Sequence, residues 1–265
     1  MDFTDTPQAT DADPQRRFGG VARLYGGAAY ARFARAHAVV VGIGGVGSWA
    51  AEALARSGVG ALTLVDLDHI AESNTNRQIH ALGDEYGKAK VVAMAARIEQ
   101  INPACRVTAI DEFVTPDNAT TLLPAADVVL DCIDQVSAKA ALIAHCRAQR
   151  FEVVTCGGAG GRIDPTRIRQ DDLARAHGDP LLSKVRYRLR RQFGFPRDSA
   201  RRTPKFGVAA VFSDEPIRRP SEECDPSARL ACAGYGSSVA VTAALGFAAV
   251  AAALQALARP HVEAD

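Results

Sequence analysis

The sequence lacks any Cys-x-x-Cys pair, the spacing that structural zinc sites commonly use. Its six cysteines are instead scattered along 265 residues. We therefore expect no zinc ion and no disulfide scaffold, and this cysteine usage fits a reducing cytoplasm. The six are Cys105, Cys132, Cys146, Cys156, Cys224 and Cys232.

Net charge is also nearly absent, because 31 lysines and arginines balance 30 acidic residues and leave +1. Any contact with nucleic acid must then come from local basic patches. Residues 1–14 are acidic and polar and lack the apolar stretch of a secretory signal. We expect them to form a disordered lead-in.

One long segment lacks charge. No charged residue lies between Arg229 and Arg259, and residues 239–258 are almost wholly apolar. This length could span a membrane, but alanine favours a helix strongly and lipid only weakly. We favour a buried helix in a cytoplasmic protein, with membrane association through residues 239–258 as the alternative.

Apolar stretches of strand length alternate with stretches of helical periodicity through the first 156 residues. Such alternation predicts an α/β fold with a Rossmann-like, mostly parallel sheet and helices on both faces. Ligands of these sheets bind beyond the carboxyl ends of the strands. The predicted strands are 37–43, 61–66, 106–111, 127–133 and 152–156, and the predicted helices are 46–57, 88–101 and 136–149.

Beyond residue 156 the sequence predicts a C-terminal extension with a basic helix and an apolar helix. Residues 157–161 form a glycine-rich loop, and residues 180–193 have the periodicity of an amphipathic helix. A further strand is expected at 206–212, followed by a polar connection, 213–230, to the apolar helix.

The most informative motif is the glycine turn Gly42-Ile43-Gly44-Gly45-Val46-Gly47, which follows a β-branched strand and opens a helix. Glycines let the backbone approach a phosphate closely, and the free N–H groups of the first helical turn favour its charge. Asp66 ends the second predicted strand, where an acidic side chain bonds ribose hydroxyls. These features alone fit NAD, FAD and ATP sites equally.

The residues that follow are unlike those of a hydride-transferring enzyme. Arg77 and Lys90 could contact phosphates from two sides, while Asp134 holds a magnesium ion against them. Neutralising developing negative charge is most of phosphoryl-type catalysis, and NAD chemistry does not require it. We expect Arg77, Lys90 and Asp134 to be the catalytic residues.

Taken together, these motifs resemble the ATP-dependent adenylating family that includes the activators of ubiquitin and of small sulfur-carrier proteins. The shared pattern is the glycine turn, an acid after the second strand, Asn-x-x-Arg-Gln, a helix lysine and a D-x-x-D strand end, over residues 33–161. The resemblance implies an ATP site with a magnesium ion at Asp134. The implied ATP contacts are Gly42, Gly44, Gly45, Gly47, Asp66, Asp68, Asn74, Arg77, Gln78, Lys90, Asp134 and Arg17.

Further segments resemble the tRNA threonylcarbamoyladenosine dehydratase branch of this family, over nearly the whole chain. They are Arg17-Phe18-Gly19-Gly20, Arg23-Leu24-Tyr25-Gly26, the run from Asn76 to Leu82 and the run from Thr155 to Thr166. The branch uses ATP, in a ligase-type reaction, to activate the carboxylate of a modified adenosine beside the anticodon, which then cyclises with loss of water. The alternative within the family is activation of a ubiquitin-like sulfur carrier.

The resemblance also implies a homodimer in which an N-terminal arginine, Arg17 or Arg23, reaches the partner's ATP. It divides a single domain, 1–265, into an N-terminal segment and dimer arm (1–32), an ATP-binding adenylation core (33–161), a basic RNA-facing region (162–231) and an apolar C-terminal helix (232–265). A monovalent cation at 157–161, a reactive thiol at Cys232 and a sulfur-transfer partner are left open.

Transfer RNA would meet the basic region, because arginine contacts phosphate through a bidentate fork. Unpaired anticodon bases also need aromatic stacking partners, for which Tyr187 and Phe195 are candidates. Two other functions stay open, an inactive nucleotide-binding platform and an NAD-dependent oxidoreductase. The basic candidates are Arg186, Arg188, Arg190, Arg191, Arg197, Arg201, Arg202 and Lys205.

Overall fold

Seven strands form one sheet in the order β3-β2-β1-β4-β5-β7-β6. The computed structural model describes residues 13–199, 203–218 and 235–259. Neighbouring strands run parallel except β6, which is antiparallel to β7. The predicted mostly parallel α/β sheet is therefore confirmed. The strands are β1 (His37–Val41), β2 (Ala61–Val65), β3 (Arg106–Ile110), β4 (Val128–Asp131), β5 (Glu152–Cys156), β6 (Ile168–Asp172) and β7 (Ala209–Ser213).

Consecutive side chains of the central strand β1 face opposite sides of the sheet, as the period of a strand requires. Val40 packs into one hydrophobic cluster, whereas Val39 and Val41 pack into a second. All three are fully or almost fully buried. A strand buried on both faces needs a continuous β-branched run, which is what the sequence supplies.

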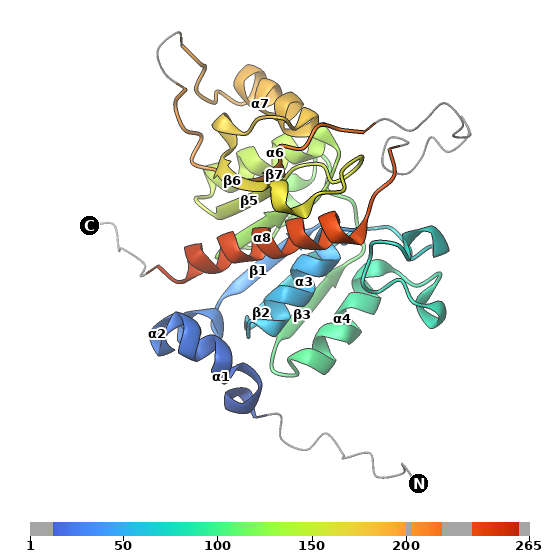
Figure 1. Cartoon of the computed structure of the whole chain (residues 1–265). Helices are drawn as coiled ribbons and strands as arrows, with labels where there is room; N and C mark the ends of the chain where they lie inside the picture. Colours follow the sequence, from blue (N-terminus) through green and yellow to red (C-terminus); the bar gives the residue numbers. More distant parts are fainter. Residues whose placement is uncertain (1–12, 200–202, 219–234, 260–265) are drawn as a thin grey trace, which may run out of the picture.

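Three helices cover the first face: α3 (Gly47–Arg56), α4 (Lys90–Ile101) and α8 (Val239–Leu257), which lie side by side in Figure 1. α8 crosses α3 closely, because a Cβ built on Gly246 would lie 2.6 Å from the carbonyl oxygen of Val46. By length and composition α8 could cross a membrane, but 56% of its 18-residue apolar window is buried inside the protein. It packs against the sheet as the predicted buried helix.

The second face is covered by α5 (Ala119–Leu122), α6 (Val136–Ala148) and α7 (Pro180–Gln192). α7 has the predicted amphipathic character, with Leu182, Val185 and Leu189 buried along one side. Helices therefore lie on both faces, as predicted. Short 3-10 turns occur at Glu72–Asn74, Gly83–Glu85, Pro165–Arg167 and Leu173–Arg175.

Several elements differ from the predictions. The polar edge strand β6, which reads IRQDD and has no apolar alternation, and the two N-terminal helices α1 (Pro14–Tyr25) and α2 (Gly27–Phe33) were not predicted. The predicted strand 206–212 begins later, at Ala209, because the N–H groups of Phe206 and Gly207 donate to the Asp172 carboxylate instead of a strand, each at 2.8 Å. The expected basic region thus contributes two strands to the sheet.

Candidate functional site

The glycine turn lies at the carboxyl end of β1, where its shape depends on a contact between two glycines. A Cβ built on Gly47 would lie 1.7 Å from the carbonyl oxygen of Gly42, so only glycine fits there. Gly42 itself has φ +87°, a conformation that side chains with a Cβ rarely adopt. By contrast, a Cβ on Gly44 would have no described atom within 4 Å, so the turn is open at its outer edge.

Asp66 connects this turn to the end of β2. One carboxylate oxygen accepts the N–H of Ile43 at 2.6 Å, and the other accepts the N–H of Asp68 at 2.8 Å. Burial raises the pKa of Asp66, and the nearby Lys90 and these two N–H groups oppose that rise. Each oxygen keeps a further lone pair, so the carboxylate can still accept a hydrogen bond from a ligand hydroxyl.

Lys90 is the first residue of α4, and its side chain is 6% exposed. Its ammonium nitrogen lies 2.6 Å from the carboxylate of Asp68, whose side chain is 53% exposed. Asp68 also donates its N–H to Asp66, so Lys90, Asp68, Asp66 and Ile43 form one continuous polar chain. The helix lysine and the glycine turn therefore belong to the same edge.

Arg77 packs directly on the turn. A Cβ on Gly45 would lie 3.3 Å from both Cγ and Cδ of Arg77. The Arg77 guanidinium donates to the Ser73 carbonyl and the Asn76 side chain, each at 2.8 Å. The indole N–H of Trp49 on α3 donates to the backbone carbonyl of Arg77 at 2.9 Å. The predicted arginine thus lies within reach of a ligand on the glycine turn.

The neighbouring polar side chains are buried. Asn74 accepts the N–H of Ala71 at 3.0 Å, which shapes the short turn before Arg77. Gln78 is 6% exposed, and its carbonyl oxygen Oε1 has no hydrogen-bond partner among the described residues. A buried acceptor without a partner costs free energy, so Gln78 fits a site that a polar ligand completes.

The turn after β4 meets the glycine turn from the other side. A Cβ on Gly42 would lie 3.0 Å from Cγ2 of Ile133 and 3.1 Å from the carbonyl carbon of Cys132. Asp134 follows directly and is exposed. Asp131, the first acid of the D-x-x-D strand end, is fully buried and paired with Lys139 at 2.9 Å. Its charge is already satisfied inside the protein.

Among the described residues, no three His, Cys, Asp or Glu side chains gather where they could hold a metal ion. Magnesium, however, is commonly bound by one or two carboxylates together with substrate phosphates and water. The single exposed carboxylate of Asp134 fits that kind of site.

Arg17 lies elsewhere in its own chain. Its guanidinium donates to the carbonyls of Gln100 and Ile101, at 3.0 and 2.8 Å, at the carboxyl end of α4. Lys90 begins that helix of 12 residues, so roughly 18 Å of helix separates Arg17 from the lysine. Arg17 does not join the glycine turn of its own chain; instead it lines a pocket of about 440 Å³ with Phe18, Arg56, Arg97, Gln100 and Ile101.

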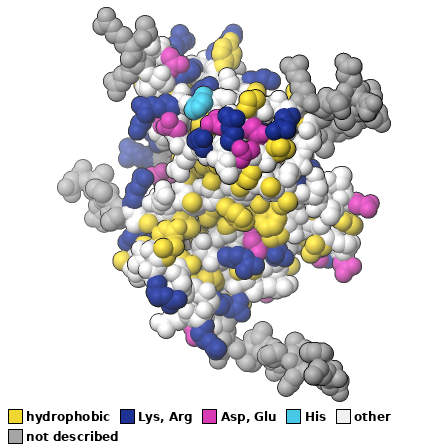
Figure 2. Space-filling model, viewed as in Figure 1, with side chains coloured by type: hydrophobic (Ala, Val, Ile, Leu, Met, Phe, Trp, Pro, Cys, Tyr) yellow, Lys and Arg dark blue, Asp and Glu magenta, His cyan; other side chains and the backbone are white. Residues whose placement is uncertain are grey.

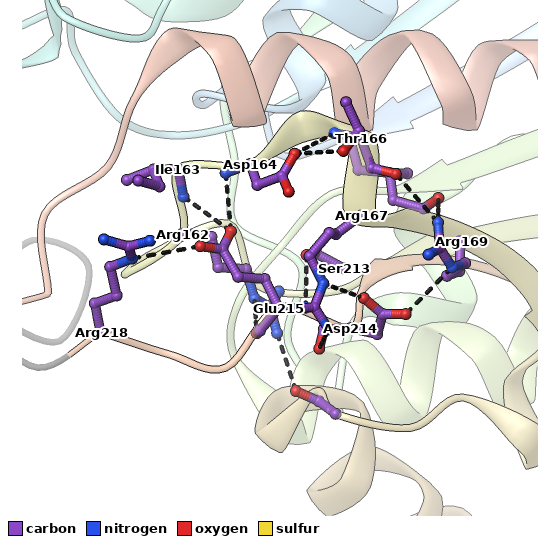
Figure 3. Close-up of polar contacts among 12 residues, drawn as sticks. Arg162, Ile163, Asp164, Thr166, Arg167, Arg169, Ser213, Asp214, Glu215 and Arg218 are labelled. Atoms are coloured by element: carbon purple, nitrogen blue, oxygen red, sulfur yellow. Dashed lines mark hydrogen bonds and ion pairs between the residues drawn. The ribbon is translucent and has the colours of Figure 1, made fainter.

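Buried charges hold the loop after β5 at the same carboxyl edge. Arg162, 2% exposed, pairs with Asp179 at 3.0 Å and donates to the Gly158 carbonyl. Figure 3 shows Glu215 accepting the N–H groups of Ile163 and Asp164, at 3.0 and 2.9 Å. Arg162 and Glu215 thus hold the glycine-rich loop and the residues that follow it. The sequence alone gives no sign that these two charged side chains have this structural role.

The basic residues expected to meet RNA have different local roles. Arg190 pairs with Asp198 at 2.7 Å and lies 5.1 Å from the centre of the Phe206 ring, so it holds the loop after α7. Arg191 donates to the hydroxyl of the exposed Tyr187 at 2.7 Å. Arg197 is exposed. Arg201, Arg202 and the thiol candidate Cys232 lie outside the described residues.

Comparison with known proteins gives the family. The model of the ThiF family matches residues 19–263, so the chain belongs to the ThiF family.

Its similar relatives are named tRNA threonylcarbamoyladenosine dehydratase. That of Escherichia coli K12 is 52% identical over 252 residues, covering 91% of this chain and 93% of the relative. That of Haemophilus influenzae is 47% identical over 240 residues, covering 89% and 91%. A crystal structure of the E. coli enzyme in complex with ATP superposes with a TM-score of 0.83 at 52% identity, covering 92% of this chain and 94% of that one. The resemblance stated from the motifs is thereby confirmed.

The pH dependence of stability tests the electrostatic environment of His80, a buried histidine near Lys90. His80 is 2% exposed, and neither ring nitrogen has a hydrogen-bond partner among the described residues. Burial, together with the positive charges of Lys90 and Arg97, lowers the pKa of His80 from 6.5 to about 4. The folded protein therefore binds fewer protons than the unfolded chain, and His80 costs stability as pH falls from about 6.5 to about 4.

We expect His80→Phe to make the fall in unfolding free energy between pH 6.5 and 4 shallower by up to about 3 kcal/mol, since the ring no longer has to be kept neutral. Urea denaturation at several pH values measures this, and His69→Gln, at an exposed histidine, is the control. Parallel pH profiles for His80→Phe and the wild type would contradict the assignment.

Proposed function

We propose that this protein catalyses the ATP-dependent dehydration of N6-threonylcarbamoyladenosine in tRNA. The threonyl carboxylate is adenylated with release of pyrophosphate, and the group then cyclises with release of AMP. The observation that carries the proposal is the gathering of Asp66, Arg77, Lys90 and Asp134 around one glycine turn. Support comes from the tRNA threonylcarbamoyladenosine dehydratases at 47 and 52% identity and from the ATP complex of the E. coli enzyme.

The chain's own groups define how ATP would be held. The open edge at Gly44 and the first N–H groups of α3 face the phosphates, and Asp66 accepts from the ribose hydroxyls. Arg77 and Lys90 supply positive charge from two sides, while Gln78 offers an unpaired acceptor. Magnesium, when bound at Asp134, supplies charge neutralisation at the phosphates.

The chemistry requires this arrangement because a carboxylate is a poor electrophile. Joining it to the α-phosphate converts its oxygen into a good leaving group. A nitrogen or oxygen of the same threonylcarbamoyl group can then close a five-membered ring, so the second step needs positioning and no external nucleophile. Arg77 and Lys90 stabilise the negative charge that grows on the phosphates during the first step.

Lys90→Met tests the enzyme activity directly. We expect it to reduce formation of the cyclic nucleoside by about 10²- to 10³-fold, because one charge at the developing negative centre is removed. Mass spectrometry of nucleosides from tRNA incubated with ATP measures this. Lys88→Met, which removes an exposed lysine two residues away, is the matched control and should keep wild-type activity. Stimulation of pyrophosphate exchange by a small glycine-terminated protein, and not by tRNA, would favour the sulfur-carrier alternative.

We further propose that the exposed arginines of α7 and its following loop bind tRNA phosphates. Arg191, Arg197 and Lys205 are the described candidates that are exposed, whereas Arg190 is engaged with Asp198. Tyr187 is 62% exposed beside Arg191 and could stack on an unpaired base.

Replacing Arg191 and Arg197 by glutamine should weaken tRNA binding and reduce the slope of log affinity against log salt by about one for each phosphate that no longer meets an arginine. Filter binding at several salt concentrations measures the slope. Arg106→Gln, on an exposed arginine of β3 at the opposite sheet edge, should leave the slope unchanged. Equal salt slopes for all variants would show that Arg191 and Arg197 do not contact tRNA and would contradict the proposal that α7 binds it.

A homodimer is proposed on two grounds. The outer side of α8 presents apolar groups, including Val239 and Phe247 at 41 and 48% exposure, and Figure 2 shows hydrophobic side chains across this face. Arg17 lies at the opposite end of α4 from Lys90 and does not reach the glycine turn of its own chain, so we propose that Arg17 or its neighbour Arg23 serves the partner's ATP. Arg17 supports α4, while Arg23 is exposed on α1.

Complementation distinguishes the two arginines. If Arg17 acts in the partner's site, mixing inactive Arg17→Ala and Lys90→Met chains restores about a quarter of the sites, because half of the dimers are then hybrid with one intact site. The same experiment with Arg23→Ala tests the other arginine. No recovery with either variant, under conditions of subunit exchange, argues against a shared site.

The remaining expectations also stand as proposals. We place the protein in the cytoplasm, since its substrate would be tRNA and more than half of α8's apolar window is buried. A monovalent cation at residues 157–161, a reactive thiol at Cys232 and a sulfur-transfer partner stay predictions.

A further inference from the structure

The interior of the protein contains an ion pair that the proposed ATP site does not use. Lys139 of α6 and Asp131 at the end of β4 both have fully buried side chains, and the ammonium nitrogen lies 2.9 Å from Oδ1 of the carboxylate. Burial raises the pKa of Asp131, and Lys139 and Thr155 oppose that rise. The surrounding residues of α6, such as Ala138, Ala140 and Leu142, are apolar and buried.

The ammonium group of Lys139 also contacts the backbone of the turn between β4 and α6. It donates to the carbonyl of Ile133 at 2.9 Å and to that of Asp131 at 3.2 Å. One buried nitrogen therefore holds a carboxylate and two carbonyls. Asp134, the exposed residue that we assign to magnesium, is the next residue along the turn.

The second oxygen of Asp131 is held from the neighbouring strand. The hydroxyl of Thr155 on β5 donates to Oδ2 at 2.7 Å. Thr155 therefore fixes the carboxylate from β5, whereas Lys139 joins the carboxylate to the carbonyls that precede Asp134. Thr155 therefore affects only the position of the Asp131 carboxylate, whereas Lys139 can also affect the conformation of the turn that leads to Asp134.

A buried ion pair is weak evidence for a role in stability, because removing two charges from water offsets most of their attraction. Apolar side chains of similar size would fill the same space. What they could not do is hold the carbonyls of residues 131 and 133 at a defined distance from a strand end. The ion pair is therefore better explained as a device that fixes the conformation of this turn than as a source of stability.

We propose that Lys139 is a positioning residue, which, anchored by Asp131, sets the turn so that the Asp134 carboxylate faces the magnesium–ATP complex. The inference rests on the proposed ATP site and adds a second level of organisation to it. Lys139 itself does not touch ATP, because its side chain is fully buried among protein groups.

The test is a double-mutant cycle on magnesium-dependent nucleotide binding. Calorimetry with a non-hydrolysable ATP analogue gives the affinity with magnesium and with EDTA. Lys139→Met should leave the EDTA affinity within about twofold of wild type and reduce the gain from magnesium about tenfold, as Asp134→Asn does. The two changes together should be no worse than Asp134→Asn alone, since Lys139 acts through Asp134.

Two further variants separate positioning from folding. Thr155→Val removes only the 2.7 Å hydrogen bond to Asp131, so it should lower the denaturation midpoint while keeping the magnesium gain. Because Lys139→Met leaves the charge of Asp131 buried without its cation and can fail to fold, Asp131→Asn with Lys139→Met is made in parallel. This pair restores charge balance but not the contacts with the carbonyls, so it should fold and still lack the magnesium gain.

The outcomes are distinguishable. Full recovery of the magnesium gain in the Asp131→Asn, Lys139→Met protein, or additive losses in the cycle, overturns the positioning role and leaves the ATP site intact. A wild-type protein that binds the analogue without any magnesium gain overturns the metal assignment of Asp134 and, with it, this inference. Non-additive losses with normal EDTA affinity support it.

Discussion

The close approach of Gly47 to Gly42 is the constraint on which the rest of the nucleotide edge depends. With only 1.7 Å between the position of a Cβ at Gly47 and the Gly42 carbonyl oxygen, α3 can begin directly against the end of β1. Asp66 then connects the turn to the end of β2, and Ile133, in the turn after β4, packs against it. Since parallel strands end at the same edge, residues far apart in the sequence converge on one short turn.

The electrostatics of this edge are organised around cations in partly buried positions. The buried Lys90 side chain pairs with the more exposed carboxylate of Asp68. Arg77 packs against the backbone of the glycine turn at Gly45. Burial is the main cause of the low pKa of His80, and Lys90 and Arg97 lower it further because they disfavour another positive charge beside them. The fixed positive charges of Arg77 and Lys90 favour an anionic ligand such as a triphosphate at this edge.

The sequence predicted the fold well where local chemistry and global position agree. Val39, Val40 and Val41 can only be a strand buried on both faces, and the glycines after them can only be a tight turn. It failed where the chain is polar or the partner is remote. The edge strand β6 has no apolar alternation, and the contact of the Arg17 guanidinium with the end of α4 left no signal in the sequence. Lys139 left one signal, a charge inside an otherwise apolar stretch of α6, but its partners lie eight and six residues away on a turn that only the folded chain brings together.

Two buried ion pairs occupy equivalent places in the architecture. Lys139 with Asp131 holds the turn after β4, and Arg162 with Asp179 holds the loop after β5, the next strand in the sheet. In both cases the cation also donates to backbone carbonyls, those of Asp131 and Ile133 in one and those of Gly158 and Gly178 in the other.

Loops at the carboxyl edge cannot satisfy their carbonyls through the sheet, because the strands have ended. A buried cation solves that problem and gives each loop one conformation, at the cost of desolvating a charge. Both ion pairs lie beneath the carboxyl edge of the sheet, where rigid loops are needed to bind a ligand. The two hydrophobic clusters on the faces of the sheet have no such loops to hold and remain apolar.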